Sequence, residues 1–242
     1  MAVFSTKDNG REPIHWKVEK FAEIPFEEWV QQMTDLIPLV DAGTIVEPKR
    51  QELKDALTSI LIEGLMPAFL ELKEIRQCTS GKPILHQWQP YEDLARKLWK
   101  AYKELMQNAV RSMDLDIGFL FQEETKFHKG LAAFRQKNPR LHEKFEELLE
   151  GTRTGWQEAL AKFRNSFLEH QGGDRKDFEW FYKPENAELI FDAVWRAIAN
   201  ILPMLLELRL PEGICLIEQH PDDPGPRWPQ RFRYQGPRRE NS

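Results

Sequence analysis

Cysteine is scarce in this 242-residue chain, which has two, Cys78 and Cys215. They lie far apart and form no CxxC pattern or Cys/His cluster. A disulfide framework or a zinc site is therefore not expected, and the compartment that we expect is the reducing cytoplasm. Walker-type and GxGxxG loops are absent, and the serine-containing stretches lack a nucleophile elbow, which argues against phosphate-loop, dinucleotide-binding and serine-hydrolase classes.

An excess of positive charge is also missing, because the formal net charge is −5. This balance argues against a protein that is coated for nucleic-acid binding, although it leaves room for local basic patches. Residues 1–13 lack the apolar stretch of a leader. No apolar run approaches the roughly 18–20 residues that a membrane span needs. We therefore expect a soluble, cytoplasmic protein with no membrane association.

Residues that build a core are plentiful, since 41% of the chain is hydrophobic and it contains 8 Trp and 15 Phe. Helical patterns with acids in or near their first turn follow four prolines directly: Pro48, Pro90, Pro139 and Pro184. Proline is pre-organised for the first helical position, and early acids favour the helix dipole. These starts and the hydrophobic period predict helices over 26–37, 48–77, 90–113, 115–136, 139–171 and 184–209.

Two of these segments carry a clear apolar stripe at three- and four-residue steps. Segment 139–171 places on one face Leu141, Phe145, Leu148, Thr152, Trp156, Ala159, Phe163 and Phe167. Segment 184–209 has a comparable face of Leu189, Ile190, Val194, Ala197, Ile198, Ile201 and Leu205. We expect the centre of these stripes to be buried, namely Phe145, Leu148, Trp156, Phe163, Val194 and Ile198.

The fold class that follows is all-α, an up-and-down helical bundle with short connections and an irregular Pro/Arg-rich C-terminal tail. We expect an N-terminal extension with a short helix over 1–45, the bundle over 46–210, and the tail over 211–242. Pro67 with Gly64, and Pro203, are expected to bend their helices. Segment 212–220 is a candidate short edge strand.

The tail interleaves arginines with aromatic residues and has no helical period. Arg227, Arg231 and Arg233 are candidate RNA-binding residues, because arginines and aromatic rings together bind phosphates and stack on bases. The alternative is a solvated tail that packs one aromatic side chain on the bundle, since short arginine-rich tails are common.

A second candidate site is the stretch "AKFRNSFLEHQGG", residues 161–173, where Arg164, Asn165 and His170 lie on one predicted helix. Six residues rise roughly 9 Å and leave the side chains about 120° apart, so an extended arginine reaches a phosphate that His170 also touches. The following glycines put His170 in the last turn, where the helix dipole favours imidazolium. This suits acid–base chemistry near neutral pH.

This motif resembles that of the HEPN superfamily, the higher eukaryotes and prokaryotes nucleotide-binding domains. The family pattern is Arg, four to six residues, then His, usually with a polar residue such as Asn after the Arg. Arg164, Asn165 and His170 match it, and "FYKPENAELIFDAVWRAIANIL" follows as a last helix. The resemblance covers about residues 90–209. It implies a HEPN-type bundle that dimerises so that two motif copies face one cleft.

The resemblance also implies metal-independent RNA cleavage, often in toxin–antitoxin or antiphage defence systems. The 2′-hydroxyl of RNA then attacks the adjacent phosphate and leaves a cyclic phosphate and a 5′-hydroxyl. His170 would transfer a proton, Arg164 would stabilise the phosphorane, and Asn165 would orient either the histidine or a phosphate. No cofactor or metal is implied, and the partners would be RNA and either a second copy or another helical protein.

One departure from the family pattern matters, and two alternative functions remain open. The family members that pair with nucleotidyltransferase antitoxins have a tyrosine where this chain has Gly172, so regulation through that tyrosine is not supported. Many such bundles serve only as interaction or sensor subunits, which is the alternative function, and an unrelated helical scaffold is a third possibility. Glu124 and His128 lie one turn apart, as metal ligands do, but no such pair recurs.

Overall fold

The computed structural model describes residues 26–78, 88–141, 145–165, 179–209, 215–218 and 231–234. Within them the chain has an all-α fold, as the sequence predicts. Four long helical stretches form the bundle in this described part: α2 (Lys49–Thr58), η2 (Ser59–Leu65) and α3 (Met66–Cys78); α4 (Gln89–Glu104), η4 (Leu105–Ala109) and α5 (Val110–Ser112); α7 (Phe145–Thr152), η6 (Arg153–Gln157) and α8 (Glu158–Arg164); and α9 (Pro184–Glu207).

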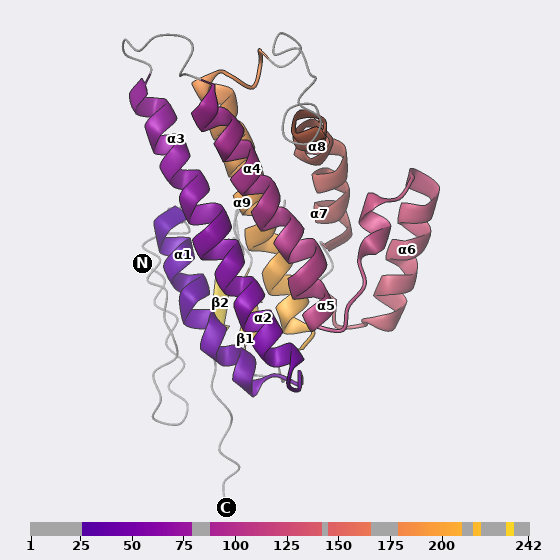
Figure 1. Cartoon of the computed structure of the whole chain (residues 1–242). Helices are drawn as coiled ribbons and strands as arrows, with labels where there is room; N and C mark the ends of the chain where they lie inside the picture. The colour runs from indigo at the N-terminus through magenta and orange to yellow at the C-terminus, as the bar shows by residue number, and fades with distance from the viewer. Residues whose placement is uncertain are drawn as a thin grey trace, which may run out of the picture.

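Shorter elements surround these stretches (Figure 1). They are α1 (Phe26–Leu36), η1 (Ile37–Ala42), η5 (Gly118–Phe121), α6 (Glu124–Lys137), β1 (Cys215–Glu218) and β2 (Arg231–Tyr234). The strands pair antiparallel, with Cys215 opposite Tyr234 and Glu218 opposite Arg231. β1 confirms the short strand that was expected within 212–220. The tail was expected to be irregular, and that was wrong for 231–234, because this segment gains a backbone partner in β1 that its own period does not reveal.

The long stretches alternate in direction, which gives the up-and-down order. At one end of the bundle the backbone N–H of Thr44 donates to Arg209 O at 2.9 Å, and the Arg209 side chain donates to Met113 O. At the opposite end Tyr182 donates to Glu92 at 3.2 Å. Each long stretch therefore starts at the end of the bundle where the previous stretch finishes, so successive stretches run antiparallel. α4 contacts α3, α8 and α9.

Three of the four prolines stand at helix starts as predicted. Pro48 precedes α2, Pro90 lies in the first turn of α4, and Pro184 begins α9. The expectation for Pro139 was wrong, because Pro139 lies in a turn and α7 is described only from Phe145. The residue before it, Asn138, leaves the helical region at φ −125° and ψ 73°, as a residue before proline prefers.

The start that was predicted for the helix over 115–136 was also wrong, since α6 begins at Glu124. Asp114 has a φ of 54°, which ends the preceding helix in the left-handed region. Arg209 donates to the carbonyl oxygens of Met113 and Asp114 and so satisfies that helix end. This arginine lies just after the C-terminal end of α9, so the local sequence does not reveal the break.

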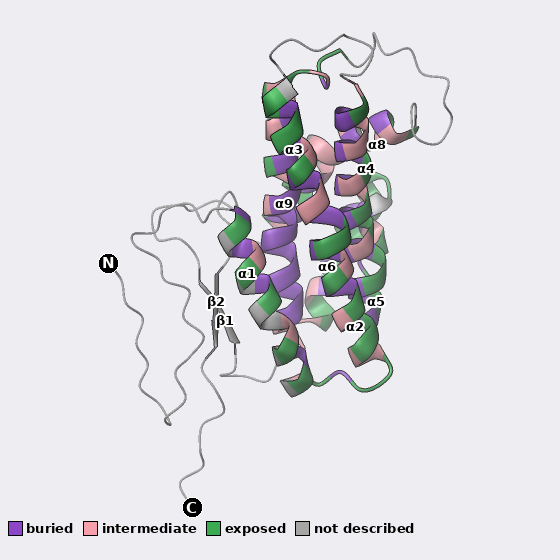
Figure 2. Cartoon of the chain, turned by 60° about the vertical axis from the view of Figure 1, so that its left-hand side comes forward, coloured by how far each residue is buried: buried purple, intermediate pink, exposed green. Residues whose placement is uncertain are grey.

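The core runs through the whole bundle, and α9 is its most enclosed element, mostly purple in Figure 2. Phe145, Leu148, Phe163, Val194 and Ile198 are buried, as predicted. Trp156 was expected to be buried and is only partly buried, because it faces an open groove that is described below.

α9 also corrects the expectation that no apolar run is long enough to span a membrane. By length and composition this helix could cross one, and 78% of its apolar window is buried inside the bundle. A central bundle helix is surrounded by other helices and is therefore apolar on most of its sides. The absence of membrane association stays a prediction.

Gly64 and Pro67 mark an irregular part of the first long stretch, where a bend was expected. The π-helical η2 ends at Leu65, two residues before Pro67, whose missing N–H leaves the carbonyl of Glu63 without its α-helical partner. A Cβ at Gly64 would lie 2.6 Å from Ala101 Cβ and 3.0 Å from Ala101 Cα. Glycine is therefore what allows η2 to approach α4 this closely.

The helix α1 packs into the same core. Trp29 is 1% exposed and lies 5.6 Å from Trp195 between ring centroids, and Phe26 lies 4.8 Å from Phe69. α1 therefore contributes to the bundle, although it falls inside the segment 1–45 that was expected to be an extension. The boundaries of that segment and of 46–210 and 211–242 stay predictions.

Candidate functional site

Arg164 is the last residue of α8, and its neighbours explain its position. Leu160 and Phe163 are 1% and 0% exposed, so this face of α8 is anchored in the core. Phe163 contacts Phe181 with 4.3 Å between ring centroids. The side chain that follows on the helix, Arg164, is consequently held at the edge of the core, where it is half-buried.

Among the described residues, Trp99 and Asn165 both contact the guanidinium of Arg164. Its Cζ lies 4.6 Å from the ring centroid of Trp99 on α4. Its Nε and Nη2 donate to the side-chain oxygen of Asn165 at 3.0 and 2.6 Å. A cation over an indole face contributes about 0.5–2 kcal/mol, depending on how far the pair is desolvated. The motif residues Arg164 and Asn165 therefore form one unit, and Trp99 is its platform.

The third motif residue, His170, lies outside the described residues, which stop at Asn165 and resume at Glu179. Of the candidate RNA-binding residues in the tail, Arg227 also lies outside. Arg231 and Arg233 lie in β2, where the backbone is described and the side chains are not.

A cluster of aromatic and polar groups lies beneath Arg164, between α4 and η6. Tyr102 is fully buried, and its hydroxyl donates to Gln157 Oε1 at 2.7 Å. Its ring meets Trp156 edge to face at 4.7 Å between centroids, and Trp99 at 5.9 Å. Burial raises the pKa of Tyr102 above its ordinary value of 10.0. The phenol is therefore neutral at physiological pH and acts as a structural hydrogen-bond donor.

Trp99 and Tyr102 were not expected to belong to the site. The sequence carries one signal for them, since residues three apart share a helix face and both are aromatic. The indole Nε1 of Trp99 is buried and donates to no acceptor within the described ranges. The position of Trp99 is thus set by its contacts with Tyr102 and Arg164 rather than by a hydrogen bond of its own.

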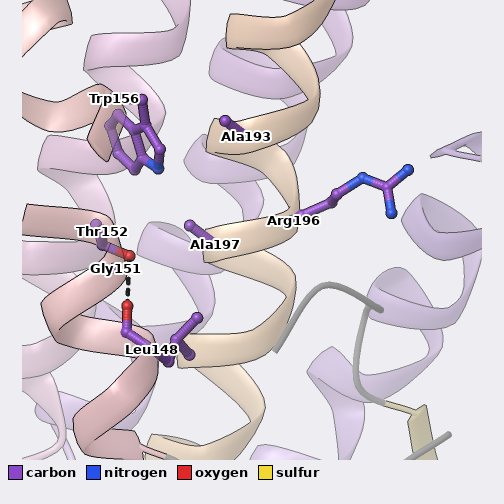
Figure 3. Close-up of a pocket in the computed structure, with 7 residues that line it drawn as sticks. All are labelled: Leu148, Gly151, Thr152, Trp156, Ala193, Arg196 and Ala197. Atoms are coloured by element: carbon purple, nitrogen blue, oxygen red, sulfur yellow. Dashed lines mark hydrogen bonds between the residues drawn. The ribbon is translucent and has the colours of Figure 1, made fainter. Parts of the chain in front are cut away.

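A groove opens between α7, η6 and α9, on the long stretch that ends with Arg164 (Figure 3). Its volume is about 400 Å³, and it is lined by Leu148, Gly151, Thr152, Trp156, Ala193, Arg196 and Ala197. The lining is mainly apolar because the guanidinium of Arg196 points away from it. Arg196 Nη2 lies 3.7 Å from Asp192 Oδ2. The hydroxyl of Thr152 is satisfied by Leu148 O at 2.9 Å, so it offers the groove little polarity.

The described residues contain no group of three or more His, Cys, Asp or Glu side chains that could hold a metal ion. Glu124 and His128, the one-turn pair considered in the sequence, are both exposed on α6. The guanidinium of Arg164 is held by Trp99 and Asn165, and its planar donors suit a phosphate group.

Comparison of the chain with family models, with curated proteins and with solved structures finds no match.

Proposed function

We propose that this protein is a metal-independent endoribonuclease of the HEPN type, acting as a dimer in prokaryotic antiphage defence or in a toxin–antitoxin pair. The observation that supports it most is the arrangement of Arg164. Its guanidinium is held by Asn165 and lies over Trp99 at the end of α8, six positions before His170. A cation that is positioned before the substrate arrives stabilises developing charge without reorganising.

In the proposed reaction the 2′-hydroxyl of RNA attacks the neighbouring phosphorus, and the bond from phosphorus to O5′ breaks. The 2′-hydroxyl loses a proton and the leaving O5′ gains one. His170 is the residue of this chain suited to one of these transfers, because imidazole titrates near neutral pH. Arg164 stabilises the negative charge that gathers on the phosphorane oxygens, and Asn165 holds Arg164 in place.

Dimer formation is part of the proposal, because one chain supplies one copy of the motif. The apolar groove between α7 and α9 supports it, since Trp156 and Gly151 leave this face open on the same long stretch that carries Arg164. A second copy, or another helical subunit, seated there would cover apolar surface and lie beside α8. Light scattering that finds a strict monomer, with and without RNA, would remove a shared active site from the proposal.

The test of the activity is cleavage of end-labelled RNA by the full-length protein in the presence of EDTA. We expect fragments with 2′,3′-cyclic phosphate and 5′-hydroxyl ends, and no cleavage of DNA of the same sequence, because DNA lacks the attacking hydroxyl. Arg164→Ala should lose this cleavage. Arg76→Ala is the matched control for removing an arginine side chain, since Arg76 pairs with Glu188 on α9. Cleavage that EDTA abolishes, or products with other ends, would contradict the mechanism.

A second candidate function is a non-catalytic interaction or sensor subunit of a larger defence complex. The observation in its favour is that two donors of Arg164 are directed to Asn165 within the chain. The negative net charge of −5 points the same way, because a free ribonuclease benefits from a basic face. This function would be favoured if the protein cut no RNA in any condition tested and bound a protein partner stably.

A further inference from the structure

We infer that the helix α6 and the turn after it form an RNA-backbone surface that continues the site of Arg164. The inference rests on the proposed function for the identity of the ligand, and on charge and geometry for its place. α6 packs against η5 and, through Arg135 and Glu146, against α7, as Figure 1 shows beside the bundle.

The charge of this segment is opposite to that of the whole chain. Residues 124–140 hold five cationic side chains and one carboxylate, which gives 5 − 1 = +4, whereas the whole chain has −5. The remaining residues therefore carry −5 − 4 = −9. The charged groups of the segment are Glu124, Lys126, Lys129, Arg135, Lys137 and Arg140. Glu123 and Glu146, which pair with Lys126 and Arg135, lower this excess to 5 − 3 = +2. A local positive excess in an otherwise acidic protein is what a polyanion-binding surface requires.

Helix geometry gathers three of these cations on one flank. Lys126, Lys129 and Lys137 follow at steps of three and eight residues, so they lie within about 80° of one another around the axis. All three are exposed. Phe127, Leu131 and Phe134 are buried and hold the other side of α6 against the bundle.

Two of these lysines form no ion pair in the described part, and the third forms an exposed one. Lys129 and Lys137 form no ion pair with any residue that the structure describes. Lys126 pairs with Glu123 at 2.9 Å, but both side chains are about two-thirds exposed, at 65% and 67%. Such a pair contributes little and exchanges readily for a phosphate.

The surface lacks the anchors of a protein interface. The large hydrophobic side chains that are exposed in the described part are Val46, Ile62, Leu70, Trp180 and Leu189, and none lies on α6. Protein interfaces gain their binding energy mainly from buried aromatic and apolar anchors. Lysines separated by small residues such as Ala133 instead suit a flexible chain of phosphates, which they bind through charge alone.

Arg153 connects this surface to Arg164. Its guanidinium lies 5.1 Å from the ring centroid of Phe127 on α6, and its Nη2 donates to Gln122 O at 3.3 Å. Arg153 precedes Arg164 by eleven positions on one continuous helical stretch, which is about 16 Å along the axis. Both arginines lie over an aromatic ring of a neighbouring helix. A few nucleotides of single-stranded RNA cover this distance from the reactive phosphate to α6.

The test compares two triple variants with the same change of net charge. The first is Lys126→Gln with Lys129→Gln and Lys137→Gln. The control is Lys49→Gln with Lys54→Gln and Lys73→Gln, whose lysines pair with Asp114, Asp41 and Glu27. Binding of a 2′-O-methylated single-stranded RNA, which cannot be cut by its own hydroxyl, is measured by fluorescence anisotropy over a salt series.

We expect the slope of log affinity against log salt to fall by about 2 units in the α6 variant, at roughly 0.7 per phosphate contact. The control should keep the wild-type slope, and replacing the same three α6 residues by Arg should keep it too. Equal slopes in the α6 and control variants, while the wild type binds and cuts RNA, would overturn this inference alone. A wild type that neither binds nor cuts RNA would overturn the proposed function and this inference together.

Discussion

The guanidinium of Arg164 on α8 lies over the indole of Trp99 on α4, with 4.6 Å from Cζ to the ring centroid. This contact joins two long helical stretches that are separated by η5 and α6 in the chain. It acts together with the two hydrogen bonds that the guanidinium donates to Asn165. The position of Arg164 is therefore a property of the bundle and not of α8 alone.

Removing the platform should impair RNA cleavage more than it impairs folding. We expect Trp99→Leu to lower the cleavage rate about 2- to 30-fold, which corresponds to the 0.5–2 kcal/mol of a cation over an indole. Trp99→Phe keeps an aromatic face and should recover most of the rate. Single-turnover cleavage measures the effect, and equal rates for Trp99→Leu and Trp99→Phe would separate Trp99 from the positioning of Arg164.

Two helical glycines should respond in opposite directions to alanine. At Gly64 an added Cβ would meet Ala101, including its backbone Cα at 3.0 Å, so Gly64→Ala should destabilise by about 1–3 kcal/mol. At Gly151 nothing lies within 4 Å of an added Cβ, so Gly151→Ala should stabilise by about 0.5–1 kcal/mol. Urea unfolding compares them, and a stabilised Gly64→Ala would contradict the close approach of η2 to α4.

The stability of the protein should fall more steeply with alkaline pH when Tyr102 is present. Burial raises the pKa of this phenol in the folded state, so above pH of about 10 the unfolded chain loses the proton while the folded chain keeps it. Tyr102→Phe should cost about 1 kcal/mol at neutral pH, through the lost bond to Gln157. That deficit should shrink above pH 10, as followed by unfolding at several pH values. A deficit that grows there would contradict a buried, neutral phenol.

α1 should contribute to global stability. Trp29 is 1% exposed and packs on Trp195, so Trp29→Ala should cost about 3–5 kcal/mol. Trp180 is the matched control, since it is 38% exposed and its replacement by alanine should cost much less. Thermal unfolding ranks the two variants. A Trp29→Ala variant as stable as the wild type would show that α1 is an extension that does not stabilise the bundle, as the sequence suggested.

The helices could be predicted wherever the signal is local. Pro48, Pro90 and Pro184 mark their starts because a proline just before or within the first turn of a helix depends on nearby backbone alone. The break near Asp114 could not be predicted, because the arginine that satisfies it comes from the end of α9. The strand β2 escaped prediction for the same reason, since its partner β1 lies well before it in the chain.

The candidate site was predictable only in part. Arg164 and Asn165 were identified from their order and from the helix that carries them, and they do contact each other. Trp99 could not be assigned to the site, because a helix face does not show which neighbour will pack on it. The partly buried state of Trp156 likewise depends on the groove between α7 and α9, which exists only after packing.

The central claim is that Arg164 and His170 act together on one RNA phosphate. The most direct measurement is single-turnover RNA cleavage, in EDTA, by the wild type, by Arg164→Ala, by His170→Ala and by the double variant. Each single change should slow cleavage about 10²- to 10⁴-fold, and the double variant should be scarcely slower than either, because both groups serve one transition state. Full activity in His170→Ala, or losses that simply multiply in the double variant, would contradict the claim.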